Sequence, residues 1–380
     1  MKFDLILAGG RVIDPSQNLD RTADVAFRDG RVVAVGAGLA REGAASVRDV
    51  SGKIVTPGLI DLHTHVYWGG TSLGLDPEML ARRSAVTTLV DAGSAGPGNF
   101  HGFRKHVIEP SPVRVLPYIN ISYAGIFAFS RPVMVGECSD IRLLDARECV
   151  RVAREHADLV VGVKVRVGGV ASFGTGVAPL DFALDAADEL GLPVMAHLDY
   201  PPPSRIEVLS RLRPGDVLTH CFRPFPNAPV HGDGRLHDEV LAARARGIIF
   251  DIGHGGGSFG FRTARAALAA GFLPDAISSD AHQLSIDGPA YDLLVTMSKF
   301  LCLGMPLVEV VRCATATPAK ALRRQQLGTL VAGAAGDASV LEIARGAFEY
   351  VDVIGETIVG DQRIVSHGAV VSGGWMEATA

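Results

Sequence analysis

The 380-residue sequence lacks the features that mark disulfide-rich, nucleic-acid-binding or membrane proteins. Its five cysteines are odd in number, scattered and without a C-x-x-C pair, which argues against a disulfide framework or a thiolate zinc site. A net charge of −5 provides no basic surface for nucleic acid or anionic lipid. No uncharged apolar run reaches the roughly 18 residues that span a bilayer. The first ten residues also lack the apolar region of a signal peptide. We therefore expect a soluble, cytoplasmic protein.

Both ends of the chain contain short β-like runs. Residues 5–7, 11–13, 24–27 and 31–35 are the clearest near the start, and the Asp29-Gly30 pair between the last two is a strong hairpin signal. Residues 338–343, 349–353 and 363–365 form similar runs near the end. Neither set has enough strands for a stable sheet of its own. We predict that residues 1–54 and 331–380 combine into one small β-sandwich domain.

The middle of the chain alternates strand-like and helix-like segments. Helical patterns occupy residues 180–190, 238–246 and 261–270, among others. The apolar runs between such segments end at eight polar residues: His65, Asp91, Asn120, Arg166, His197, His220, Asp251 and Asp280. Eight such units predict an α/β fold in which residues 55–330 form a (β/α)₈ TIM barrel. A doubly wound open sheet is the alternative, but it needs a glycine-rich phosphate loop after its first strand, and residues 66–70 read Val-Tyr-Trp-Gly-Gly.

Residues with metal-binding side chains stand at the ends of five predicted strands. Residues two apart on a strand point to the same face, so His63 and His65 should project together. The fourth, fifth, sixth and eighth strands end near Lys164, His197, His220 and Asp280. Because the carboxyl ends of barrel strands meet at one rim, we expect these six side chains to meet.

Each of these residues also has a structural interpretation. A histidine at a strand end can be a hydrogen-bonded core residue, Asp280 after two serines can cap a helix, and Lys164 can pair with a carboxylate. The coincidence of all six at one rim favours a metal site. Imidazole and carboxylate suit Zn²⁺ and related ions, and two ions about 3.5–4 Å apart can share a hydroxide, a nucleophile available near neutral pH.

The order of these residues resembles the binuclear metal branch of the amidohydrolase superfamily. The resemblance covers nearly the whole chain and includes residues 314–322 with the short motifs at 328–330 and 336–338. It implies two divalent ions, with zinc as the expected metal. His63, His65 and Asp280 would hold the first ion, His197 and His220 the second, and an N-carboxylated Lys164 would join them. It also implies hydrolysis of a C–N or C–O bond by a metal-bridging hydroxide, with Asp280 as general acid and base.

Within the superfamily, the chain resembles a dihydroorotase-like group of bacterial deacetylases. Dihydroorotases typically carry an arginine soon after the first His-X-His, whereas residues 66–68 of this chain read Val-Tyr-Trp. They also tend to have Asp-His-Ala-Pro-His at strand eight, whereas residues 280–283 here read Asp-Ala-His-Gln. Residues 121–125, 162–166 and 251–259 match the deacetylase group. The resemblance therefore implies deacetylation of small N-acetyl or O-acetyl acids.

Three alternatives stay open. The first is a dihydroorotase or hydantoinase-like enzyme, which would open a cyclic amide. The second is a mononuclear deaminase, which would not need Lys164. The third is a non-catalytic scaffold, which would be expected to have lost metal ligands, although none of the six is missing. We expect a small-molecule substrate and no nucleic-acid or membrane partner. A homo-oligomer is compatible with the sequence.

Loop residues after the strands are candidates for substrate contacts. These are Tyr123, Arg223, His254 and His282, which can hold a carboxylate or stabilise an oxyanion. Arg223 is the natural carboxylate partner because of its planar guanidinium. Each of the four is equally compatible with a surface loop position. Arg166 either faces the site or pairs with an acid.

Overall fold

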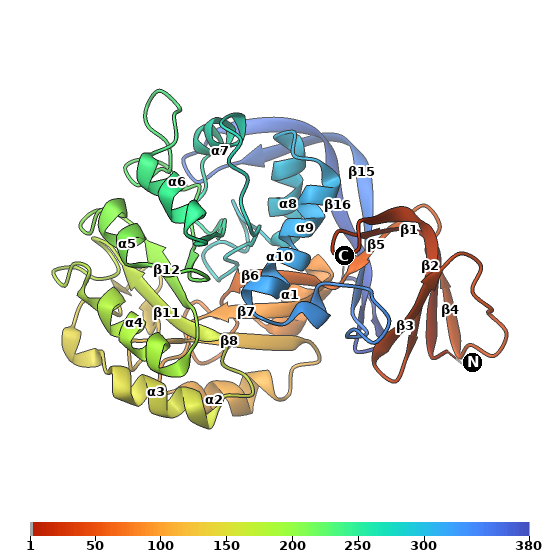
Figure 1. Ribbon diagram of the computed structural model, residues 1–380, viewed down its shortest axis with the longest axis horizontal. Helices are drawn as coiled ribbons and strands as arrows, with labels where there is room; N and C mark the ends of the chain where they lie inside the picture. The colour runs from red at the N-terminus through yellow and green to blue at the C-terminus, as the bar shows by residue number, and fades with distance from the viewer. Residues whose placement is uncertain (1–2, 380) are drawn as a thin grey trace.

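The computed structural model describes residues 3–379, which form a parallel sheet covered by helices and a second sheet built from both ends of the chain (Figure 1). The parallel sheet contains β6 (Leu59–Thr64), β7 (Val86–Ala92), β8 (Arg114–Asn120), β11 (Gly162–Val167), β12 (Val194–Leu198), β13 (Val217–Leu218) and β14 (Ile249–Phe250), paired in that order. Residues 276–281 form isolated parallel bridges to Asp251 on one side and to Thr64 on the other. The predicted eight units therefore correspond to seven strands and one segment without a regular strand.

Helices follow the strands and surround the parallel sheet (Figure 1). They are α1 (Pro77–Ser84), α2 (Phe100–Phe103), α3 (Ala146–Glu155), α4 (Ala178–Leu190), α5 (Arg205–Arg211), α6 (Asp238–Ala245), α7 (Phe261–Ala269), α8 (Leu293–Cys302), α9 (Leu307–Cys313) and α10 (Ala316–Ala321). The helical patterns at 180–190, 238–246 and 261–270 match α4, α6 and α7 closely. None of the helices within residues 3–379 has the length and apolar character needed to cross a bilayer.

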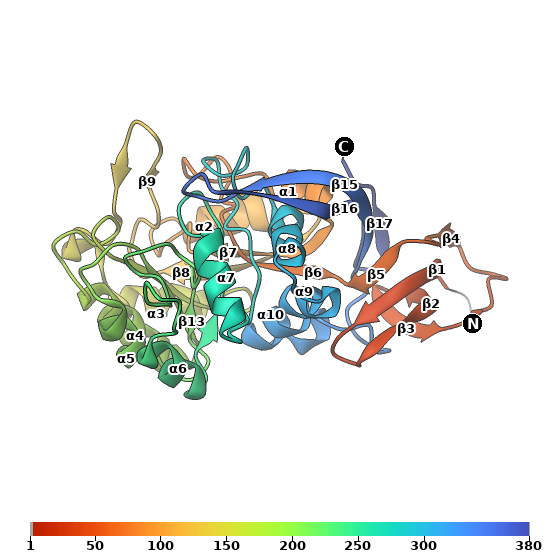
Figure 2. The same cartoon turned by 90° about the horizontal axis from the view of Figure 1, so that it is seen from above.

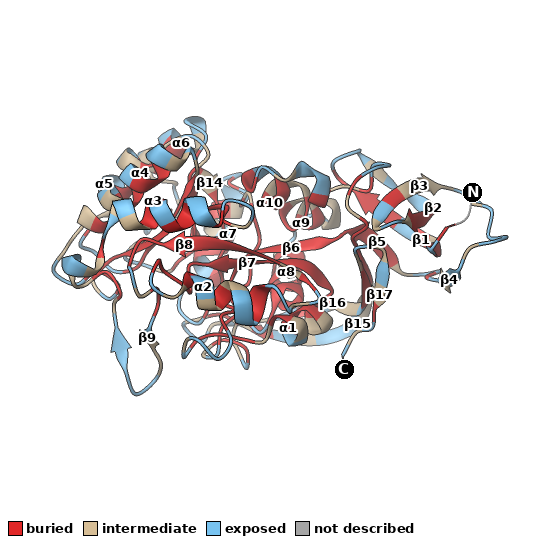
Figure 3. Cartoon of the chain, turned by 90° about the horizontal axis from the view of Figure 1, so that it is seen from below, coloured by how far each residue is buried: buried red, intermediate tan, exposed pale blue. Residues whose placement is uncertain are grey.

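Alternation along the strands separates two buried surfaces. In β11, Val163, Val165 and Val167 belong to the apolar core that includes the surrounding helices. Leu116 and Tyr118 of β8 belong to a different buried cluster, which includes side chains from five other strand segments and from α10. The intervening residues of β11, including Lys164, are therefore directed away from the helix-facing core. Figure 3 shows this burial along the whole parallel sheet.

The second sheet joins the two ends of the chain, as predicted. Its strands are β1 (Leu5–Asp14), β2 (Leu19–Arg28), β3 (Arg31–Gly36), β4 (Ser46–Asp49), β5 (Ile54–Pro57), β15 (Ala338–Val351), β16 (Thr357–Val371) and β17 (Gly374–Met376). β15 pairs with β5, which pairs with β1. Asp29 and Gly30 have φ values of 51° and 69° between β2 and β3, as the predicted hairpin requires. The pairing gives one sheet, and a division into a two-sheet sandwich stays a prediction.

The hairpin of β15 and β16 is longer than its apolar runs suggest. Its far half leaves the second sheet and packs on α8 (Figures 1 and 2). Ile364 N donates to Ser298 Oγ at 2.9 Å, and Lys299 Nζ donates to Val351 O at 2.8 Å. The C-terminal hairpin therefore pairs with β5 of the second sheet and also packs on α8. The predicted domain boundaries at residues 54 and 331 stay a prediction.

A short hairpin, which the sequence did not predict, projects from the molecule near the parallel sheet. It consists of β9 (Ala128–Phe129) and β10 (Met134–Val135), and Figures 2 and 3 show β9 standing away from the main body. Met134 and Val135 are exposed, whereas Glu137 just beyond β10 is fully buried. The hairpin therefore extends from a buried base.

Candidate active site

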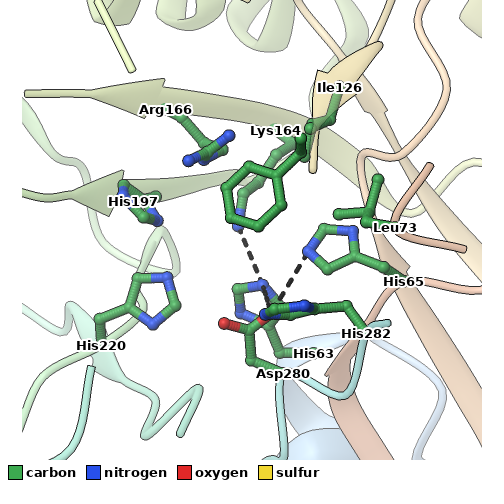
Figure 4. Close-up of a pocket in the computed structure, with 11 residues that line it drawn as sticks. His63, His65, Leu73, Ile126, Lys164, Arg166, His197, His220, Asp280 and His282 are labelled. Carbon is green, nitrogen blue, oxygen red and sulfur yellow. Dashed lines mark hydrogen bonds and ion pairs between the residues drawn. The ribbon is translucent and has the colours of Figure 1, made fainter. Parts of the chain in front are cut away.

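A pocket opens at the carboxyl ends of the parallel strands (Figure 4). Its lining contains all six predicted metal-site residues and five others: His63, His65, Lys164, His197, His220 and Asp280, with Leu73, Ile126, Phe129, Arg166 and His282. Eight of these eleven side chains are polar or charged, so the pocket suits a polar ligand.

The six side chains reach the pocket from different backbone settings. His63, Lys164 and His197 lie within β6, β11 and β12, and His65 follows β6 directly. His220 lies two residues beyond the short β13, and Asp280 lies in the segment 276–281. His220 and Asp280 have φ values of 64° and 47°. This left-handed conformation is strained for non-glycine residues and is common at functional sites.

Three of the six form a compact cluster of potential ligand atoms. One atom each of His63, His65 and Asp280 lies within 4.8 Å of the others. Asp280 Oδ1 is 3.4 Å from His63 Nε2 and 3.3 Å from His65 Nε2. Lys164 Nζ lies 3.4 Å from His63 Nε2, as the dashed lines in Figure 4 show. This spacing leaves room for a cation among the three groups.

The remaining two histidines lie next to this cluster. The ring centroids of His197 and His220 are 4.4 Å apart, and those of His220 and His63 are 5.1 Å apart. His197 Nε2 is buried and makes no hydrogen bond among the described residues, although Asp199 Oδ2 lies 3.5 Å away. A buried nitrogen without a partner costs free energy unless something else binds it. The donor set therefore fits a metal site.

Hydrogen bonds at Nδ1 orient the imidazoles. Thr219 Oγ1 donates to Asp251 Oδ2 at 2.7 Å, so its lone pairs are left to accept from His63 Nδ1 at 2.8 Å. His220 Nδ1 donates to Gly253 O at 2.7 Å. A proton fixed on Nδ1 leaves Nε2 as a lone pair directed toward the pocket, as in metal-binding histidines.

Burial favours the neutral forms of the histidines and of Lys164. It lowers the pKa values of His63, His197 and His220 well below the ordinary 6.5 and that of His65 to about 3. Burial also lowers the pKa of Lys164 to about 7, although Asp280 opposes this effect. Neutral imidazoles can bind metals, and a neutral amine can react with CO₂.

Two glycines make space for the ligands. A Cβ atom on Gly93, after β7, would lie 2.5 Å from Lys164 Cβ. A Cβ on Gly255, beyond β14, would lie 2.2 Å from Asp280 Oδ2. Both glycines have positive φ, so larger residues would be strained as well as crowded.

The four predicted substrate-contact residues lie in different surroundings. His282 lines the pocket, and burial lowers its pKa to about 4. Arg223 is buried and donates from Nη2 to Ser258 Oγ at 2.8 Å, but it is not part of the pocket lining. Tyr123 lies outside the lining and is 48% exposed.

His254 is also outside the pocket lining. Its Nδ1 donates to Gly255 O at 2.9 Å, and its Nε2 accepts from Lys299 Nζ at 2.7 Å. The ring stacks on Phe259 with centroids 4.7 Å apart. Lys299 Nζ also donates to Pro289 O and Val351 O. The structure thus places His254 in a buried contact between its loop and the β15 strand.

Sequence reasoning missed the apolar lining of the pocket and one buried acid. Leu73, Ile126 and Phe129 come from loops or from the projecting hairpin, where no periodic pattern identifies them. Arg166 satisfies both of its predicted alternatives, because it lines the pocket and pairs with Glu137 at 3.0 Å. Only the alternation of β11 gave a signal for Arg166, and none was available for Glu137.

No protein-family model matches the chain. A deacetylase of Agrobacterium fabrum is 38% identical over 328 residues, covering 86% of this chain and 80% of the relative. A deacetylase of Brucella anthropi is 37% identical over 341 residues, covering 90% and 84%. Two solved structures have TM-scores of 0.91. One, described as an adenine deaminase, is 29% identical and covers 99% of this chain and 100% of its own. The other, described as a dihydroorotase, is 34% identical and covers 99% of each chain.

The two deacetylases and the structure described as a dihydroorotase exceed 30% identity over most of both chains. The dihydroorotase-like deacetylase group predicted from the sequence is therefore among the chain's relatives. The chain is a metal-dependent enzyme that belongs to the amidohydrolase superfamily.

Proposed function

We propose that the protein deacetylates small N-acetyl or O-acetyl acids, such as acetylated amino or hydroxy acids. The observation that carries this proposal is the similarity to two deacetylases over at least 80% of their lengths. The lining supports it, because eight of its eleven side chains are polar or charged and can contact the acid and acyl groups of such a substrate. The acid in the substrate also suits a pocket that contains a guanidinium, that of Arg166.

The donor set supports two divalent ions in this pocket. We assign His63, His65 and Asp280 to the first ion, His197 and His220 to the second, and an N-carboxylated Lys164 to a position between them. The unpartnered His197 Nε2 and the lowered pKa of Lys164 support this assignment. Bound ions, with zinc as the expected metal, would lower the pKa of the attacking water and polarise the scissile carbonyl.

Asp280 has the position of the proton carrier. Its carboxylate lies within 3.4 Å of both His63 Nε2 and His65 Nε2, and His282 lines the same pocket. It would accept a proton from the attacking water and give it to the leaving nitrogen or oxygen. The acyl C–N or C–O bond breaks, and acetate and an amine or alcohol leave. Burial raises the pKa of Asp280, which favours transient proton binding.

A dihydroorotase is the second candidate function. The similar structure described as a dihydroorotase, at 34% identity over 99% of the chain, favours it. A cyclic amide would need the same water attack and the same proton transfer, but its leaving nitrogen would stay attached to the product. Deamination of adenine deserves the same test, because a structure described as an adenine deaminase is also similar.

The deciding experiment measures metal content and turnover on the same holoenzyme preparation. We expect close to two metals per chain and acetate release from a panel of acetylated amino and hydroxy acids. Dihydroorotate and adenine should remain unchanged. Asp280→Asn should eliminate acetate release, whereas Asp287→Asn, at an exposed position outside the pocket lining, should leave it unchanged. Turnover of dihydroorotate or adenine without acetate release would refute the proposal.

A further inference from the structure

Arg166 holds a cationic group inside the pocket that the metal assignment does not use. It lies on β11 two residues after Lys164, opposite His197 of β12 in the sheet register. Its side chain is only 8% exposed, and it lines the pocket. Figure 4 shows Arg166, Lys164 and His197 extending from neighbouring strands into the same space.

Two residues, one in the projecting hairpin and one just beyond it, hold the guanidinium. Nη1 donates to Glu137 Oε2 at 3.0 Å, and Glu137 is fully buried. On another side the guanidinium carbon lies 5.0 Å from the ring centroid of Phe129, in β9. An ion pair and a cation–π contact together restrict the rotation of a long side chain. The arginine is therefore oriented before any ligand arrives.

The anchoring leaves one edge of the guanidinium without a protein acceptor. Among the described residues, the structure shows no hydrogen bond from Nε or Nη2 of Arg166. Arginine has five N–H donors, and neither Nε nor Nη2 of Arg166 is among the buried polar atoms that lack a partner, so both stay accessible to a ligand. The Nε and Nη2 edge matches a carboxylate, which accepts two parallel hydrogen bonds.

Arg223 offers a weaker match than the sequence suggested. Its Nε is buried without a hydrogen-bond partner, but the residue is outside the pocket lining and its Nη2 already donates to Ser258 Oγ. Arg166, by contrast, combines a free edge, a fixed orientation and a place in the same lining as the metal-binding side chains. The pocket therefore contains an oriented anion-binding group on β11.

We propose that Arg166 binds the carboxylate of the substrate and that Glu137 and Phe129 are its positioning residues. The inference rests on the proposed deacetylation and names the group that selects acids over neutral acetyl compounds. A carboxylate on the Nε and Nη2 edge would leave the acetyl group free to extend toward Asp280. Glu137 keeps the edge turned to the pocket by occupying Nη1.

The test compares two substrates that differ in charge, N-acetylglycine and N-acetylglycinamide, by acetate release from metal-loaded protein. Arg166→Gln should raise KM for the acid about 100-fold and change KM for the amide little, because two charge-assisted hydrogen bonds are lost only with the acid. Glu137→Gln should raise KM for the acid by a smaller factor without changing kcat for the amide. Arg114→Gln is the matched control, since Arg114 pairs with the buried Asp337 at the amino end of β8.

A purely structural ion pair predicts a different pattern. Both substrates would then lose activity equally in Arg166→Gln, in parallel with a lower melting temperature, and that result would overturn the proposal. An unchanged acid-to-amide ratio at full metal content would overturn it as well.

Calorimetric binding of N-acetylglycine separates this inference from the proposed reaction. If wild-type protein binds the acid but releases no acetate, deacetylation is refuted, and loss of binding in Arg166→Gln still supports the carboxylate site. If wild-type protein does not bind the acid, or if Arg166→Gln binds it equally well, the role of Arg166 is refuted.

Discussion

Replacing Thr219 with valine tests how the protein prepares His63 for metal binding. Valine keeps the shape of threonine but removes the hydroxyl that joins His63 Nδ1 to Asp251. Asp251 Oδ2 lies 3.7 Å from Nδ1, too far to replace the lost hydrogen bond without movement. A proton on His63 Nδ1 would then have no hydrogen-bond acceptor. The tautomer with a proton on Nε2, which cannot ligate through that atom, would become more populated.

We expect Thr219→Val to weaken metal binding about 10- to 100-fold, the range for losing a hydrogen-bond partner of a ligating histidine. This range corresponds to about 1.4 to 2.8 kcal/mol. Competition with a chromophoric chelator measures the affinity for Zn²⁺, and Thr219→Ser is the matched control because it keeps the hydroxyl. Wild-type affinity in Thr219→Val would refute the orienting role of the Thr219 hydroxyl. Equal losses in both variants would assign the effect to packing instead.

Four further predictions test other parts of the structure. Asp280→Asn should lower kcat at least about 100-fold with an unchanged melting temperature, and a smaller loss would exclude Asp280 from proton transfer. Lys164→Ala should lower metal content, and failure of short carboxylic acids such as acetate to restore it would contradict a carbamate. Lys299→Met should destabilise the fold by about 2 to 4 kcal/mol in urea unfolding, because the buried His254 Nε2 and two partly buried carbonyl oxygens lose their donor. Burial raises the pKa of Asp61 from 3.8 to about 7, so the folded state retains a proton that the unfolded state releases. The resulting stabilisation, present below pH 3.8, is lost as the pH rises through 7, and Asp61→Asn should flatten this part of the stability profile.

The sequence predicted the convergence of the pocket residues for a simple geometric reason. Parallel strands place their carboxyl ends at one rim, so a polar residue at each strand end is enough to locate the site. His63, Lys164 and His197 lie on regular strands and follow this rule. Helices α4 and α6 were equally visible, because their apolar spacing follows the helical period.

The positions of the residues that the sequence did not predict, or predicted to face the pocket when they do not, depend on loop conformation. His254 turns away from the pocket because Lys299, from a helix 45 positions later, binds its Nε2. Glu137 and Phe129 reach Arg166 through a hairpin with only two residues in each strand. Neither contact produces a periodic pattern, and both join segments that are far apart in the chain. The long excursion of β15 and β16 over α8 was hidden for the same reason.

The two sides of the site are built in different ways. β6, β11 and β12 have five or six residues each and present His63, Lys164 and His197 by regular alternation. β13 has only two residues, and the segment 276–281 has only isolated bridges. His220 and Asp280 belong to this irregular side, and both have the left-handed backbone that a continuous strand would not allow. Regular pairing ends where these two side chains approach the pocket, so the irregular edge of the parallel sheet supplies His220 and Asp280 to the site.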